Sequence, residues 1–184
     1  AVQLTAMGNA VANSALAGIE DSDVQAVGDV TLTASDIAPS VIPFMDAVDD
    51  YVPDDDTRTD LEAALDGSPL DPGANILSVN VSVAGTGGVA VNGAFTGNVI
   101  ANGVATEISN STVTSDLGDI VLGSDTDSGI IALTVGVAGS GAVAVNATGF
   151  GNVIANSTTA LVTGGSDVTA TAGAVDLDAQ DSSL

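Results

Sequence analysis

Carboxylates are the most concentrated reactive groups in the sequence, and a dense group of them lies between residues 49 and 60. The group consists of Asp49, Asp50, Asp54, Asp55, Asp56 and Asp60. Carboxylate oxygens are the hard ligands that Ca²⁺ prefers in proteins. These residues do not follow the ligand spacing of a known calcium loop, so a calcium site and a solvated acidic loop both remain open. The Asp-x-Asp-x-Gly pattern in GSDTDSG at 123–129 is a second, smaller calcium candidate.

Asparagines in Asn-x-Ser/Thr sequons are candidates for glycosylation. The sequons begin at Asn80, Asn110, Asn146 and Asn156. Asn80 alternates with valines in a strand-like run, so we expect its side chain on the outer face. Asn110 lies in a polar SNST run, and we expect it to be accessible too. Asn146 and Asn156 lie near or in columns of recurring asparagines, where hydrogen bonds between repeats would compete with modification.

No group of residues in the sequence has the pattern of a catalytic site. The chain contains no His, no Cys, and a single basic residue. That residue, Arg58, lies close to three consecutive aspartates, and a surface ion pair explains it. Two carboxylates at a fixed separation can hydrolyse a glycoside, but alternation along a strand explains Asp176 and Asp178. We therefore expect a protein that is not an enzyme.

A long internal repeat organises the chain. VAGTGGVAVNGAFTGNVIAN at 83–102 returns 54 residues later as VAGSGAVAVNATGFGNVIAN at 137–156, with 14 of 20 positions identical. A partial copy, GNAVAN, lies at 8–13. Such self-similarity is typical of stacked repeat units. We expect one domain, made of a partial module (1–40), an insertion (41–72) and two modules (73–128 and 129–184).

Apolar and polar residues alternate within the modules, as in half-buried strands. The usual rule places the apolar residues inside. It predicts inward side chains for Val30, Leu32 and Ala34; for Leu77, Val79, Val81 and Val83; for Val89 and Val91; for Leu133, Val135 and Val137; for Val143 and Val145; and for Val175, Leu177 and Ala179. The same rule places the intervening serines, threonines and asparagines outside.

The composition favours a narrow β-solenoid over a broad core. Hydrophobic residues make up 45% of the chain but aromatic ones only 2%, whereas a broad core normally uses aromatics to fill volume. Asparagines recur in two columns, Asn9/Asn98/Asn152 and Asn13/Asn102/Asn156, and like residues stacked above one another form hydrogen-bonded ladders. We expect two or three coils per module, for instance three of about 18 residues. A β-sandwich is the alternative fold.

The insertion at 41–72 departs from the repeat pattern. It is rich in acids and prolines, and Thr59 and Glu62 have the spacing of a capping box. Leu61, Ala64 and Leu65 share one helical face, and Gly67 is a stop signal. We expect a short helix near 57–66 in a loop that leaves the solenoid.

The glycine-valine motif resembles the repeats of leukotoxin-type filamentous adhesins, in the filamentous-haemagglutinin group of large secreted bacterial proteins. The resemblance is carried by VGVAGSGAVAVN at 135–146, the following GN-x-x-AN, and SDVTATAG at 166–173. It covers roughly 1–40 and 73–184. It implies a right-handed parallel β-helix at the cell surface with a role in adhesion. The insertion, the short length and the near absence of basic residues depart from the family pattern.

The charge excludes several partners. The net charge is −23, so nothing in the chain can neutralise the phosphates of nucleic acid or the headgroups of anionic lipid. No apolar run reaches the ~18 residues of a membrane helix. We expect an extracellular or cell-surface location.

Two functions fit these features. The first is a structural subunit of an extracellular filament, which joins itself head to tail through the solenoid ends. The chain begins inside a module and stops after a strand, and the residues expected at these ends are Val2, Val11, Val175 and Leu177. The second is a segment of a large secreted adhesin that binds a glycan or another surface protein.

Overall fold

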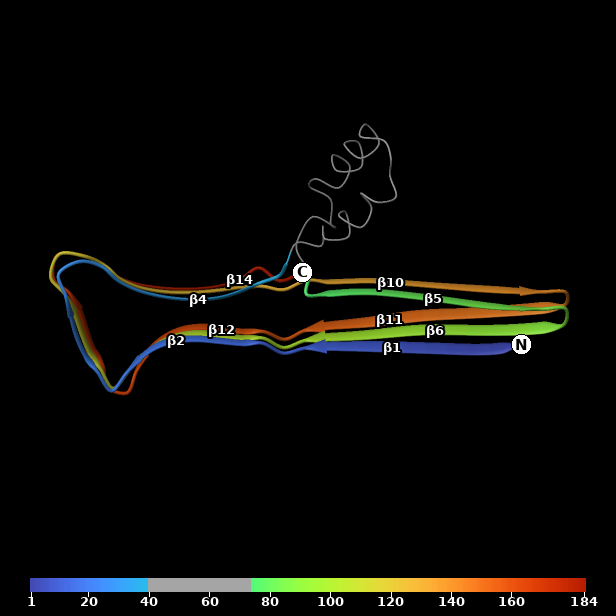
Figure 1. Cartoon of the computed structure of the whole chain (residues 1–184), viewed down its shortest axis with the longest axis horizontal. Helices are drawn as coiled ribbons and strands as arrows, with labels where there is room; N and C mark the ends of the chain where they lie inside the picture. Colours follow the sequence, from blue (N-terminus) through green and yellow to red (C-terminus); the bar gives the residue numbers. More distant parts are fainter. Residues whose placement is uncertain (40–73) are drawn as a thin grey trace, which may run out of the picture.

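The computed structural model describes residues 1–39 and 74–184, and these residues form an all-β structure without a helix (Figure 1). The insertion, with its expected helix and acidic group, lies outside the described residues. The strands are β1 (Val2–Val11), β2 (Ser14–Glu20), β3 (Asp23–Ala26), β4 (Val30–Ile37), β5 (Ile76–Thr86), β6 (Val89–Ile100), β7 (Gly103–Ser109), β8 (Thr112–Ser115), β9 (Ile120–Asp127), β10 (Ile130–Ser140), β11 (Val143–Ile154), β12 (Ser157–Thr163), β13 (Asp167–Ala170) and β14 (Val175–Asp181).

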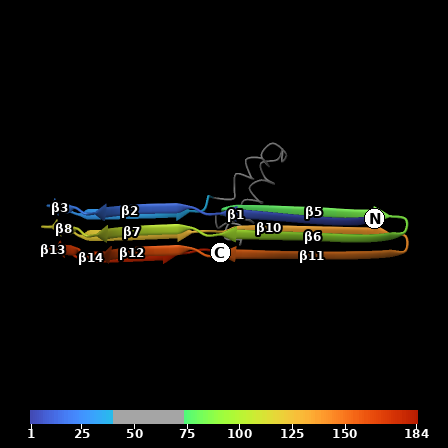
Figure 2. The same cartoon turned by 90° about the horizontal axis from the view of Figure 1, so that it is seen from below.

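Each 54-residue repeat forms one coil of a parallel β-solenoid. Strand β10 pairs in parallel with β5, and Ile130 lies opposite Ile76, 54 residues earlier. Strands β1–β4 belong to the first coil, β5–β9 to the second and β10–β14 to the third, so the described strands form five parallel sheets. Figure 2 shows the three coils as layers. The prediction of several short coils per module is wrong, because strands of 11 and 12 residues make each coil long.

The register also places the insertion. Val2 pairs with Val91, an offset of 89 residues, which exceeds the 54-residue repeat by 35. Nearly all of this excess is the 34 residues 40–73 between Pro39 and Ala74, where the Ala74 N–H donates a hydrogen bond of 3.0 Å to the Pro39 carbonyl. The coil therefore continues directly from one side of the insertion to the other.

Each coil has two halves of different shape (Figure 1). In the flat half, sheet β10–β5 lies closely over sheet β1–β6–β11, as two long layers. In the acidic half, the sheets containing β7, β8 and β9 enclose a wider interior. The names reflect charge: β1, β5, β6, β10 and β11 contain no Asp, Glu, Lys or Arg, and every acidic residue that the structure describes lies outside them.

The acidic half has the apolar interior that the alternation predicts. Leu32, Ile108, Val113, Ile120 and Leu122 form its core, and the last four are fully buried in the middle coil. The inward prediction for β4 is confirmed. The inward prediction for β14 is confirmed by its pairing, because Val175, Leu177 and Ala179 lie beside buried residues of β9.

The flat half reverses this pattern. Ser78, Asn80 and Ser82 of β5 are buried, whereas the apolar residues between them point outward. The inward prediction is therefore wrong for Leu77, Val79, Val81 and Val83, for Leu133, Val135 and Val137, for Val89 and Val91, and for Val143 and Val145. Ile76 and Ile100 are buried where the flat half meets the acidic half, and beyond that junction the closely spaced layers accept smaller side chains such as Ala84, Ala90 and Ala94, so the valines and leucines take the outer faces.

One corner of each coil has a residue in the left-handed region of backbone conformation. Asp21 and Asn110 both have φ of 48°, and Gly164 has φ of 65°. Asn, Asp and Gly are the residues that adopt this conformation at least cost. The third coil contains one additional residue here, Gly165, also with positive φ, because the offset to the second coil rises from 54 to 55 between β12 and β13.

Candidate functional site

Two columns of asparagines form ladders between coils, as the sequence predicts, and the first column bonds side chain to side chain. Asn9 donates its amide to Asn98 Oδ1 over 2.8 Å, and Asn98 donates to Asn152 Oδ1 over 2.9 Å. The ladder is directional, because each amide donates toward the coil that follows in sequence. A further coil with Asn in this column would accept the same bond from Asn152.

Corner residues form a second kind of ladder, from backbone to side chain. The Asn13 N–H donates to Asn102 Oδ1 over 2.9 Å, and the Asn102 N–H donates to Asn156 Oδ1 over 3.1 Å. Serines repeat the arrangement at the next corner, where the Ser22 N–H donates to Ser111 Oγ over 3.0 Å. Ser111 N–H in turn donates to Ser166 Oγ over 3.2 Å. These bonds satisfy corner N–H groups and fix the vertical register of the coils.

The interior of the flat half is a polar seam between its two layers. Asn92 Nδ2 donates to the Ser82 carbonyl over 3.0 Å and to Asn146 Oδ1 over 3.1 Å. Thr134 Oγ1 donates to Thr96 Oγ1 over 3.0 Å. Buried polar groups need such partners, because each unpaired one costs about 1–3 kcal/mol. The seam explains how small polar residues hold the two layers together in place of an apolar core.

The four sequons have different environments. Asn80 is buried, and its Nδ2 donates to the Phe95 carbonyl over 3.1 Å and to Thr96 Oγ1 over 3.3 Å. The outward, accessible position predicted for Asn80 is therefore wrong. Asn110 is exposed at a corner, as expected.

The remaining two sequons have both side-chain ends engaged, as the ladder argument predicts. Asn146 accepts from Asn92 and donates to the Gly136 carbonyl over 2.7 Å. Asn156 accepts from the Asn102 N–H, and its Nδ2 donates to Ser183 Oγ over 2.8 Å. Glycosylation stays a prediction, and Asn110 is the sequon that the geometry favours.

The metal candidates do not form a site among the described residues. Asp49, Asp50, Asp54, Asp55, Asp56 and Asp60 lie outside them. The second candidate is not a loop, since 123–127 belongs to strand β9. No group of three or more His, Cys, Asp or Glu residues comes together within 1–39 and 74–184.

The outer faces of the flat half carry a dense set of exposed apolar side chains. On sheet β10–β5, Val81 and Val83 are 61% and 60% exposed. On sheet β1–β6–β11, Val89, Val143 and Phe95 are 55%, 53% and 46% exposed. Exposed apolar patches larger than a few hundred Å² mark interaction surfaces. Sequence reasoning missed this surface, although the charge-free block between residues 74 and 102 and its copy at 129–154 point to it.

The four residues expected at the ends occupy two kinds of position. Val175 and Leu177 pair with the buried Ile120 and Leu122, and Val11 pairs with the buried Ile100. These three therefore belong to interior columns of the outer coils. Val2 pairs with Val91 and lies on the outer face, 81% exposed.

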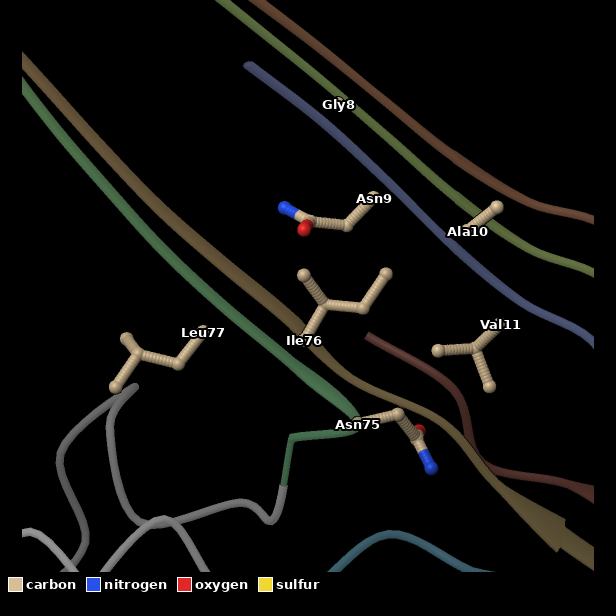
Figure 3. Close-up of a pocket in the computed structure, with 7 residues that line it drawn as sticks. All are labelled: Gly8, Asn9, Ala10, Val11, Asn75, Ile76 and Leu77. Carbon is tan, nitrogen blue, oxygen red and sulfur yellow. The ribbon is translucent and has the colours of Figure 1, made fainter.

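A shallow cavity of about 400 Å³ lies between β1 and the start of β5. Gly8, Asn9, Ala10 and Val11 line one side, and 75–77 line the other (Figure 3). It contains no charged or nucleophilic group, and its polar lining comes from Asn9 and Asn75 (Figure 3). The cavity offers no constellation for catalysis.

Within the described ranges, no helix is long and apolar enough to cross a membrane. Comparison of the chain with protein-family models, with curated proteins and with solved structures gives no match.

Proposed function

We propose that the chain is a structural subunit of an extracellular or cell-surface fibre, which lengthens as further coils stack on the ends of the solenoid. The observation that carries the proposal is the repetition of one set of contacts from coil to coil. Asparagine and serine ladders, parallel backbone pairing and interior columns recur in the same register. Another coil of the same kind fits the existing pattern without new chemistry.

In the first and last coils, side chains that belong to the interior columns are partly exposed. Val175 and Leu177 are 41% and 42% exposed, whereas Ile120 and Leu122 in the same columns of the middle coil are fully buried. Covering these side chains with another coil removes apolar surface from water, at about 25 cal/mol per Å². Unlike ends that meet head to tail make a heterologous contact, which extends into a filament unless the rotation closes a ring.

The acidity of the chain makes this assembly depend on the salt concentration. A net charge of −23 makes copies repel one another, and salt screens that repulsion over about 8 Å at physiological ionic strength. We expect fibres to lengthen as ionic strength rises.

The substitution Leu177→Asp tests the stacking. It puts a charge into an interior column of the third coil, so we expect short or absent fibres in electron micrographs at high ionic strength. Leu161→Asp is the matched control, because Leu161 lies in the same coil but pairs with the outward Glu107; it should assemble as the wild type does. Fibres of normal length from Leu177→Asp, or a wild-type chain that stays monomeric at high concentration and salt, contradict the proposal.

The denaturing mass of the native material separates the two functions that the sequence leaves open. A repeating subunit of about the 17.7 kDa of this chain supports a filament assembled from copies. One very long polypeptide supports a segment of a large adhesin that binds a glycan or protein partner.

A further inference from the structure

We propose that the outer face of sheet β1–β6–β11 is a self-association surface, on which a second copy of the chain packs face to face with its strands antiparallel. This pairing is lateral and differs from the end-to-end stacking above. The pairing itself is independent of the proposed function, and only its strengthening along a growing fibre rests on that function.

Outward residues on this face form rows across the three strands, and the rows differ in size. Gly97 of β6 lies beside Gly8 and Gly151, so one whole row is glycine. A Cβ built on Gly97 or Gly151 meets no atom within 4 Å. The row is therefore an open groove across the sheet. Val99 and Val153 border it on one side, and Phe95 on the other.

Phe95 is a large apolar group beside this groove. Its ring lies along the sheet, since a Cβ built on Gly149 would be 3.0 Å and 3.2 Å from two ring carbons. The ring is 46% exposed. A half-exposed aromatic next to an empty groove is the arrangement that a self-complementary interface needs.

A two-fold axis that runs along the stacking direction, between the two copies, brings rows of large side chains opposite rows of small ones. With the axis between the rows of Phe95 and Gly97, Phe95 of one copy faces Gly97 of the other, and the reverse. In the next pair of facing rows, Leu4, Gly93 and Ala147 face Ala10, Val99 and Val153 in that order, so each large side chain meets a small one. Complementary sizes let two sheets pack at about 10 Å without voids. On the face of sheet β10–β5 the glycine row, Gly85 with Gly139, lies at the end of the strands, and Leu77, Val79, Val81 and Val83 pair only with other large residues.

Charge favours the same orientation. Strands β1, β6 and β11 contain no charged residue, and the acidic residues lie on the other half of each coil. In the antiparallel pair the flat halves overlap, and the acidic halves point away from each other in opposite directions. A parallel pair would bring the acidic halves side by side, where like charges repel.

The contact area is at the low end for a specific dimer. With the axis between Phe95 and Gly97, each strand overlaps that of the other copy over about nine residues, such as 92–100 of β6. Three strands about 4.8 Å apart then cover about 430 Å² of sheet per copy, or about 860 Å² for the pair, whereas a specific interface needs about 1,000 Å² and weak, transient contacts are smaller. Each further coil adds about 140 Å² per copy on the same spacings, so one more coil brings the pair above about 1,000 Å² and pairing strengthens as a fibre lengthens.

Gly97→Val tests the pairing. The new side chain fits the monomer and adds apolar surface, but it fills the groove that receives Phe95. We expect it to raise the dimer dissociation constant by about tenfold or more, as a change at the centre of an interface does. Gly85→Val is the matched control, because Gly85 is equally open but lies on the opposite outer face; its dissociation constant should match that of the parent.

Both variants are measured by sedimentation equilibrium of the full chain carrying Leu177→Asp, which blocks stacking, and circular dichroism verifies the fold. Dimers that Gly97→Val weakens and Gly85→Val leaves intact support the pairing. Only monomers in the Leu177→Asp parent, or dimers that Gly97→Val leaves intact or strengthens, overturn it. Flotation with phosphatidylcholine vesicles that Gly97→Val enhances assigns the face to lipid and also overturns it. None of these results bears on fibre growth, which wild-type micrographs test separately.

Discussion

Single amide side chains decide much about how the coils hold together. Asn98 is buried, accepts from Asn9 and donates to Asn152, so it connects all three coils. A buried polar side chain of this kind stabilises the fold only while both of its ends are paired. Loss of one asparagine leaves its two neighbours with unmatched groups.

Asn98→Ala should therefore lower the stability by about 1–3 kcal/mol, the cost of leaving buried partners unpaired. Gln25→Ala is the control, since Gln25 carries an amide on the exposed face of β3 and should change stability by less than about 0.5 kcal/mol. Thermal unfolding followed by circular dichroism measures both. Equal unfolding temperatures for the two variants would show that the ladder contributes little.

The sequons also differ in how accessible the asparagine side chain is. Asn110 is exposed at a corner, whereas Asn80 is buried in the seam. We expect any N-linked glycan in native material to sit on Asn110, with Asn80 unmodified once the chain is folded. Peptide mass spectrometry after cleavage at acidic residues locates the modification. A glycan on Asn80 would show that modification precedes folding or that the strand faces are reversed.

At the scale of whole strands, the same alternation has opposite meanings in the two halves of a coil. Strand β9 turns Ile120 and Leu122 inward, and strand β5 turns Ser78 and Asn80 inward. The spacing of the layers decides which residue type fits. Wide spacing in the acidic half accepts leucine and isoleucine, and the close layers of the flat half accept alanine, serine and asparagine.

Leucine-to-alanine substitutions in the two halves test this difference. Leu122→Ala empties a buried site and should cost about 2–5 kcal/mol. Leu77→Ala alters a side chain that is 48% exposed and should cost less than about 1 kcal/mol, as surface changes do. Denaturant titration gives both values. A large loss from Leu77→Ala would mean that the outer face of β5 is covered in the monomer.

At the scale of the whole molecule, the coils form one continuous stack that the insertion does not interrupt. Pro39 and Ala74 are joined by a backbone hydrogen bond, and β4 and β5 keep the pairings of their coils on either side.

Deleting residues 41–72 should therefore leave the solenoid folded, because residues 40 and 73 suffice to join neighbouring points of the chain. The deleted protein should keep the β circular dichroism of the full chain. Its unfolding temperature should stay close to that of the full chain. Loss of the β signal would show that the insertion is part of the core.

Several features were predictable from residue types and spacing alone. The 54-residue repeat, the all-β character and the asparagine columns follow from local patterns, because like residues in a stacked repeat pair with like. The interior positions of β4 and β14 were predictable for a similar reason: Leu32 and Leu177 alternate with polar residues, and their half of the coil has the ordinary apolar interior.

Only the tertiary structure decided the length of a coil and the direction of the side chains in the flat half. An alternating strand has two faces, and its sequence does not state which face meets another sheet. The distance to the opposite layer makes that choice. The scarcity of aromatics already indicated a narrow interior, and a narrow interior excludes Val81 and Val83 while it accepts Asn80 and Ser82. The two layers meet where β6 folds back over β5, as in the contact of Ser82 with Asn92, so the alternation within one strand does not contain their spacing.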